Sequence, residues 1–160
     1  MIFVTLVANP MQSFTSVPFK TNKYHGLAEV NGFAKFSSAG IVFEFDSKLL
    51  GLVSLGVTEA RIPLEQILDV KFKKGVFKRG AKIEIRTKSL AAMEGLPSEN
   101  GKLVLKIKAD DFERGSEAVD RLQKDMAGYA ASLPPPHTSI ASIIDGSEDE
   151  TDDLRQKHER

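Results

Sequence analysis

The chain of 160 residues contains neither cysteine nor tryptophan. Without cysteine it can form no disulfide bond, thiolate metal site or cysteine nucleophile, which agrees with a reducing compartment. It also lacks the roughly 18 to 20 consecutive apolar residues that a membrane-spanning helix needs. The longest apolar run, residues 1–8, is interrupted by Thr5, has no basic leading segment and is followed by no small-residue cleavage site. We therefore expect no signal peptide and a cytoplasmic protein, with a peripheral position at the membrane left open.

Catalytic and metal-binding motifs are missing as well. The segment nearest to a phosphate-binding loop, residues 75–83, has one residue too many before its lysine and ends in isoleucine. His25, His137 and His158 lack the i, i+4 spacing of paired metal ligands. No serine lies in a G-x-S-x-G motif, and the acidic run 145–153 lacks the register of a calcium loop. We expect no enzyme, no cofactor and no metal site.

The net charge of zero conceals a strong segregation along the chain. Residues 68–108 contain eleven lysines and arginines against four acids, a balance of +7, whereas residues 109–160 contain thirteen acids against six bases, a balance of −7. Such asymmetry indicates a cationic patch that faces polyanions, followed by an acidic tail. A solvated sheet face with a solubilising tail explains the same pattern, so both interpretations stay open.

The segment 59–85 alternates between apolar and charged residues, which is typical of strands with one buried face. We expect a strand that ends at Pro63, a single turn over 64–67, and two strands joined by a loop between Gly75 and Gly80. The predicted inward residues are Leu68, Val70 and Phe72 on the first strand of the pair and Ala81, Ile83 and Ile85 on the second. The outward residues are mostly cationic, so we name residues 67–85 the basic hairpin.

The rest of the chain supplies further strands and one helix. Residues 27–36 and 41–46 read as strands, with a bulge expected at Gly32 and a turn over 37–40. Residues 102–109 read as a last strand with Leu103, Leu105 and Ile107 inward. An apolar stripe at helical spacing predicts a helix over 111–131, opened by a capping box of Asp110 and Glu113. It should end before the three prolines that begin at Pro134.

These elements divide the chain into three parts. Residues 1–26 contain scattered aromatics, two prolines and a glycine without a clear period, and we interpret them as an N-terminal arm or irregular lead-in. Residues 27–132 form the domain. Residues 133–160 are polar, acidic and poor in apolar residues, so we expect a disordered tail. The chain that precedes its acidic run, 145–153, is long enough for this run to reach the basic hairpin and mask it.

Residues 48–58 are apolar on both faces of a predicted strand. One interpretation is a strand buried in the core, because short apolar runs are usually interior. The other is an exposed apolar surface used for self-association, because large exposed patches usually mark contacts. We name it the apolar ridge; its members are Leu49, Leu50, Leu52, Val53, Leu55 and Val57.

The order of elements resembles that of the pleckstrin-homology-like (PH-like) superfamily, most closely its GRAM and bacterial PH-like branches. The resemblance covers residues 27–130 and is carried by GFAKF (32–36), GIVFEF (40–45) and RIPLEQILDV (61–70). It implies a mostly β barrel of two roughly orthogonal antiparallel sheets, capped by one C-terminal α-helix. The chain departs from the eukaryotic pattern, since the helix has no tryptophan and Lys35 is the only base between residues 27 and 46. Phosphoinositide recognition is therefore not supported.

Two functions follow from these features, and both are non-catalytic. In the first, the basic hairpin binds an anionic lipid surface, or an acidic protein, reversibly. Its candidate residues are Lys71, Lys73, Lys74, Phe77, Lys78, Arg79 and Lys82, with Phe77 entering the lipid interface. In the second, the domain is a protein-interaction or self-assembly module that uses a sheet edge or the apolar ridge. Nucleic acid is the weaker partner, since the strands present no evident aromatics for base stacking.

Overall fold

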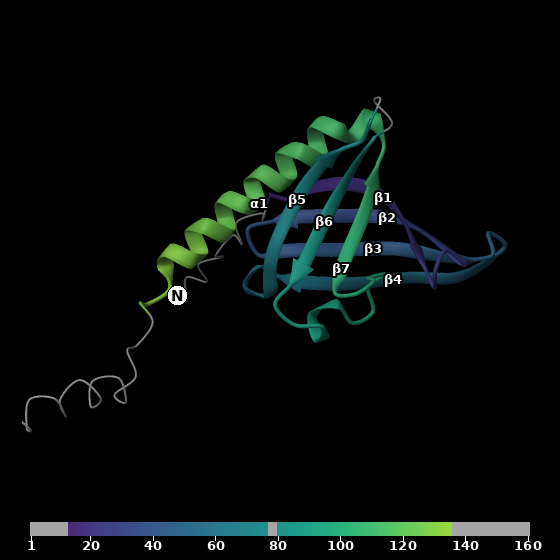
Figure 1. The fold of residues 1–160 in the computed structure, drawn as a ribbon, viewed down its shortest axis with the longest axis horizontal. Coiled ribbons are helices and arrows are strands. Elements are labelled where there is room, and N and C mark those ends of the chain that lie inside the picture. Colours follow the sequence, from purple (N-terminus) through teal and green to yellow (C-terminus); the bar gives the residue numbers. More distant parts are fainter. Residues whose placement is uncertain (1–12, 77–79, 136–160) are drawn as a thin grey trace, which may run out of the picture.

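The computed structural model describes residues 13–76 and 80–135 (Figure 1). Within them, seven antiparallel strands form one sheet in the order β4-β3-β2-β1-β7-β6-β5, and a single α-helix follows near the C-terminus. The prediction of a mostly β domain with one C-terminal helix is confirmed. The elements are β1 (Thr15–Lys23), β2 (Ala28–Ser37), β3 (Gly40–Leu49), β4 (Val53–Pro63), β5 (Ile67–Lys74), β6 (Ala81–Thr87), β7 (Lys102–Ile107) and α1 (Phe112–Ser132), with short 3-10 turns η1 (Leu64–Gln66), η3 (Ala91–Met93) and η4 (Ala109–Asp111).

Strand β1 differs from the expected N-terminal arm. It pairs with β2 along its whole length, from Thr15 opposite Phe36 to Lys23 opposite Ala28, and it buries Val17 and Phe19 in the core. Pro18 obscured this strand in the sequence. Proline is tolerated here because β1 pairs with β7 only where Lys20 lies opposite Lys106, so Pro18 withholds no donor from that ladder.

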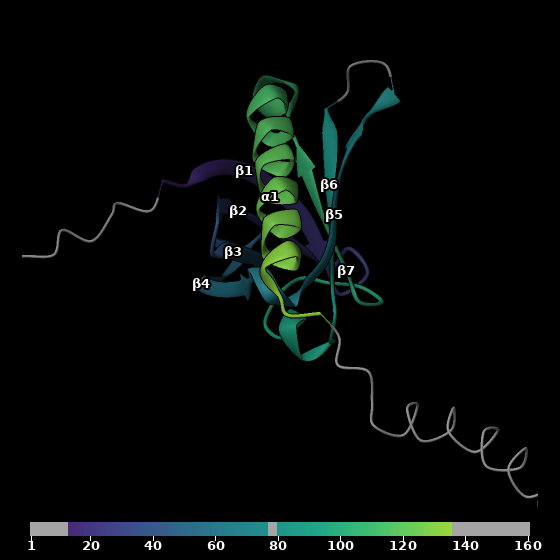
Figure 2. The same ribbon diagram turned by 90° about the vertical axis from the view of Figure 1, so that its left-hand side faces the viewer.

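The helix α1 packs along one side of the sheet and covers β5 (Figure 2). Ala118, Val119 and Leu122 are buried against the core, and the Phe112 ring meets the edge of Phe72 at 5.0 Å between centroids. Both helix ends lie within one residue of the predicted ones. The expected capping box is absent, because η4 leads directly into the helix and the cap position has no side-chain hydrogen bond.

The basic hairpin forms as predicted from β5 and β6, and η1 supplies the single turn before it. Ala81, Ile83 and Ile85 point inward and are buried. The prediction for Leu68 is wrong, since it is 52% exposed. The register slips between Ile67 and Asp69, so Leu68 is the extra residue of a bulge and turns away from the core.

The expected bulge at Gly32 is also wrong. The register of β2 runs through Gly32 without interruption on both sides. A Cβ atom at this position would instead collide with the backbone oxygen of Glu44 and lie 2.6 Å from the Cβ of Phe45. The glycine is therefore required by the close approach of β3, not by an inserted residue.

The two edge strands of the sheet differ in whether another element covers them. On β5, the Gln123 side chain of α1 donates a hydrogen bond to the Val70 carbonyl at 2.8 Å, so the helix occupies this edge. Strand β4 forms the opposite edge and pairs with β3 alone. The β3–β4 hairpin extends beyond the other strands on the right of Figure 1. One edge of the sheet is thus covered and the other is open within the described residues.

Three sequence predictions lie outside the described residues. They concern the apolar run 1–8, the placement of Phe77, Lys78 and Arg79, and the acidic tail from residue 136 onward.

Candidate functional site

Four lysines face one another across four neighbouring strands. Lys20 on β1 lies opposite Lys106 on β7. Lys106 also lies opposite Lys82 on β6, and Lys82 lies opposite Lys73 on β5. Residues directly opposite in antiparallel strands point to the same face, and neighbouring strands are about 4.8 Å apart. The four side chains, which we name the lysine row, therefore form a line of ammonium groups across the exposed face of the sheet. All four residues are exposed.

The rows next to the lysine row contain carboxylates. Glu84 lies opposite Lys71, and Arg86 lies opposite Asp69. Directly opposed like charges are unfavourable, and an opposite charge in the same row removes that cost. The lysine row differs because its two central members, Lys82 and Lys106, have no ion pair with any described residue.

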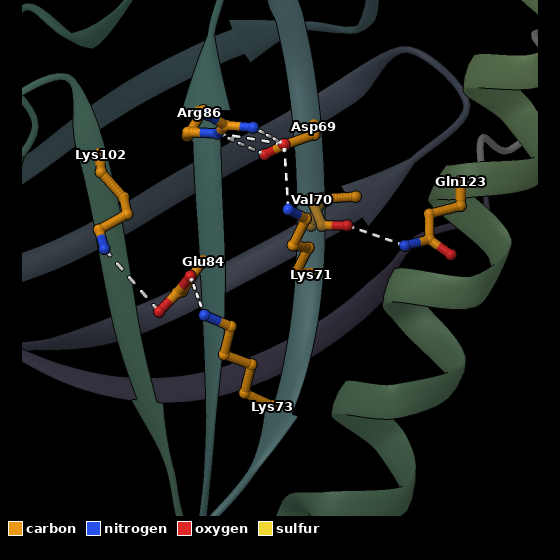
Figure 3. Close-up of polar contacts among 8 residues, drawn as sticks. All are labelled: Asp69, Val70, Lys71, Lys73, Glu84, Arg86, Lys102 and Gln123. Carbon is orange, nitrogen blue, oxygen red and sulfur yellow. Dashed lines mark hydrogen bonds and ion pairs between the residues drawn. The ribbon is translucent and has the colours of Figure 1, made fainter.

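Two carboxylates limit the cationic face on the β5–β6 side (Figure 3). Glu84 is only 17% exposed and accepts from Lys73 at 2.8 Å, with Lys102 at 3.9 Å. The hydrogen bond from Lys73 is the main reason why the pKa of Glu84 is lowered. The pKa of Asp69 is lowered mainly by the hydrogen bonds from Arg86. Both carboxylates therefore stay ionised at neutral pH and neutralise the cations beside them.

A third carboxylate lies at the β1 end of the lysine row. Glu29 on β2 accepts from Asn31 at 3.3 Å and from Lys20 at 3.4 Å, and these two hydrogen bonds lower its pKa. The Oδ1 atom of Asn31 is buried and has no hydrogen-bond partner within the described residues. The row is consequently compensated at its two ends and uncompensated at its centre.

The structure brings together some of the predicted site residues and separates another. Lys71, Lys73 and Lys82 share the exposed face of the basic hairpin. Lys74 lies opposite the buried Ala81, so it belongs to the other face, where its Nζ atom lies 5.1 Å from the centroid of the Phe112 ring. Phe77, Lys78 and Arg79 are outside the described residues.

Sequence reasoning missed two members of the row. The sequence pattern places Lys106 on the predicted last strand, outside the candidate site, and Lys20 in the N-terminal arm. The alternation of Val17, Phe19 and Thr21 is the signal in the sequence that Lys20 lies on a strand with one solvent-exposed face, and all three residues are buried in the structure.

A shallow hollow of about 370 Å³ lies beside the β1 end of the row. Its lining includes Lys20, Lys106 and Lys108, together with Asn31 and the half-exposed ring of Phe33. A second hollow of about 480 Å³ lies between the loop end of the basic hairpin and the start of α1, and it is lined by Lys74, Phe112 and Glu113, among others. The first hollow gathers three cations and one amide against one carboxylate, Asp111, which itself lies 3.6 Å from Arg114, so the lining carries a net positive charge that suits an anionic group.

The apolar ridge is exposed, so the interpretation as a buried strand is wrong. Leu52 is 88% exposed and Val57 82% exposed, and the four other members are between 37% and 69% exposed. The ridge occupies the end of β3, the turn and the first half of β4. Core packing fails there because the β3–β4 hairpin extends past β5, β6, β7 and α1, which cover the rest of the sheet (Figure 1).

The described residues contain no helix long and apolar enough to cross a membrane. The comparisons with known proteins give no further assignment. No protein-family model, no curated protein and no solved structure is significantly similar to this chain.

Proposed function

We propose that the chain is a non-catalytic, PH-like binding domain that attaches reversibly to an anionic membrane surface through the lysine row and the adjoining basic hairpin. The observation that carries this proposal is the direct opposition of Lys82 and Lys106, without a neutralising carboxylate, in the middle of four aligned lysines. Such an arrangement weakens the isolated fold and becomes favourable when anions lie against it.

The strand arrangement supports the PH-like part of the proposal. Four strands in succession are followed by three more and then by a C-terminal helix that packs against the sheet. The backbone pairing between the two groups of strands consists, within the described residues, of one residue pair, Lys20 with Lys106. Strands that cross at a large angle make such a short contact, and β5–β7 run steeply across the direction of β2–β4 in Figure 1. We therefore favour two roughly orthogonal layers capped by α1.

The energetics favour weak, reversible attachment. Each basic residue close to an anionic leaflet contributes about 1 kcal/mol, and the contribution falls off within a Debye length of about 8 Å at physiological salt. Four to six lysines give binding that salt should weaken strongly. Glu84 and Asp69 lie in the same face and reduce the attraction, so a densely anionic surface is required.

Sedimentation with vesicles of phosphatidylserine and phosphatidylcholine, compared with vesicles of phosphatidylcholine alone, tests the proposal. We expect binding to the anionic vesicles at low salt, its loss at 0.5 M salt (about a 4 Å Debye length), and no binding to the neutral vesicles. Absence of binding at low salt would overturn the proposal. Binding to soluble polyglutamate together with no binding to vesicles would replace the membrane with an acidic protein partner.

A further inference from the structure

The apolar ridge is an uncharged surface on the open edge of the sheet. Residues 49–58 contain no charged side chain. The edge strand β4 pairs only with β3, whereas the opposite edge strand β5 receives the hydrogen bond from Gln123. Proteins usually protect open edges with charges, proline or a covering element, because an open edge pairs readily with another strand. Within the described residues, β4 has a glycine bulge at Gly56 and no charge before Glu59.

The ridge is a cluster of exposed apolar side chains at one end of the β3–β4 hairpin. Leu52 and Val57 are more than four-fifths exposed, and Leu50, Val53 and Leu55 are more than half exposed. Clustered exposed apolar side chains of this kind usually mark a contact with another molecule. The ridge therefore suits an interface between two chains.

The polar neighbours of the ridge argue against an anionic lipid as its occupant. Asp46 accepts a hydrogen bond from Ser54 at 2.8 Å on the same hairpin, and Glu59 follows the ridge on β4, where it pairs with Arg61. Glu44 lies opposite Glu59 on β3. Lys35 pairs with Glu44 at 2.6 Å and the exposed Lys48 directly precedes Leu49, so the charges beside the ridge balance and offer an anionic leaflet no cationic excess. The lysine row, which would supply such an excess, lies on β1 and β5–β7.

We propose that the apolar ridge binds the same ridge of a second copy of this chain, with the two β4 strands antiparallel about a two-fold axis. In this arrangement the uncharged stretch of β4 lies against the same stretch of the second copy. The charged residues Glu59 and Arg61 fall outside the contact, so that no like charges oppose each other. The ridge is apolar on both faces of the hairpin, which a partner strand and its neighbour can cover together. Because Gly56 interrupts the strand, side-chain packing carries more of the contact than a continuous backbone ladder.

Multi-angle light scattering of the full chain over a wide concentration range tests this inference. We expect a mass that rises with concentration toward twice the 17.6 kDa of one chain. Leu52→Asp and Leu55→Asp should each raise the dimer dissociation constant at least tenfold, since a carboxylate would be buried in the interface. Leu68→Asp is the matched control, because Leu68 is also exposed but lies on the helix-covered edge. It should dimerise as the unaltered chain does.

Each other outcome contradicts the inference. A monomer at every concentration, or a dimer that Leu52→Asp and Leu55→Asp leave intact, would overturn it. A monomer that dimerises only after removal of residues 1–12 would show that the N-terminal segment, and not a second copy, occupies the ridge. The light-scattering test does not depend on vesicle binding. The lysine row lies on other strands, so substitutions there leave the ridge unchanged. The inference therefore stands or fails independently of the proposed membrane function.

Discussion

Lys82 on β6 and Lys106 on β7 lie directly opposite each other, both exposed, and neither forms an ion pair with a described residue. Opposed lysines in a sheet repel each other. The Lys73 and Lys20 side chains extend the same line but are held by Glu84 and Glu29. An external anion therefore has its most favourable electrostatic interaction at the centre of the row.

Replacing the central pair should separate stability from binding. We expect Lys82→Gln with Lys106→Gln to raise the free energy of unfolding by about 0.5 kcal/mol, because the repulsion between the two ammonium groups is removed. The same double variant should bind anionic vesicles at least tenfold more weakly. Urea unfolding and vesicle sedimentation measure the two effects. Lys88→Gln, an exposed lysine outside the row, is the control; equal loss of binding in this variant would argue for a nonspecific charge effect.

A substitution of Glu84 should have the opposite effects, lowering stability and raising affinity for anionic vesicles. Glu84→Gln removes the carboxylate that faces Lys73 and Lys102, so the variant should lose about 1 kcal/mol of stability. Its affinity for anionic vesicles should rise, because one negative charge leaves the cationic face. Glu117→Gln removes the same charge from the exposed surface of α1 and should change neither property. An unchanged affinity in Glu84→Gln would argue that this face does not contact the lipid.

The same carboxylates set the stability at acid pH. The pKa values of Asp69 and Glu84 are lowered in the folded chain, so the unfolded chain binds protons more readily. Their stabilisation is complete above the unfolded values of about 4, and it is lost as the pH falls below 4 through the lowered folded pKa values. Urea midpoints at pH 7, 5, 4 and 3 should stay level and then drop. In the Asp69→Asn, Glu84→Gln double variant the drop should be smaller, and an equal drop would contradict this assignment.

Two glycines should respond in opposite directions to alanine. Gly32→Ala should lower the free energy of unfolding by about 2 kcal/mol or more, because the new methyl group would collide with β3. Gly128→Ala should raise it by up to about 1 kcal/mol, because this helical glycine has open space around it. Thermal unfolding of both variants provides the comparison. A tolerated Gly32→Ala would contradict the close approach of β2 and β3.

The strands of the basic hairpin, the last strand and the helix could be predicted from sequence because each alternates or repeats with a clear period. Leu103, Leu105 and Ile107 are buried as predicted. Strand β1 is missed because Pro18 obscures the alternation of Val17, Phe19 and Thr21, and because the pairing with β2 that makes the strand favourable is a tertiary contact. Leu68 was misassigned because a bulge changes which side a residue faces without leaving a local signal.

The candidate site was predictable only in part for a related reason. A count of charges identified the basic hairpin, but the lysine row depends on register across β1, β7, β6 and β5, which sequence spacing does not contain. For the apolar ridge, the sequence shows the composition but not the degree of burial. Whether the ridge was buried depended on how far the β3–β4 hairpin extends beyond its neighbours.

The most direct test of the proposed function is a backbone amide NMR titration with bicelles that contain phosphatidylserine. The account predicts that the largest chemical-shift changes and line broadening occur at Lys20, Lys73, Lys82 and Lys106, and that high salt reverses them. The amides of Glu59 and Arg61 should change little. Changes confined to the β3–β4 hairpin, with the lysine row unaffected, would contradict the account.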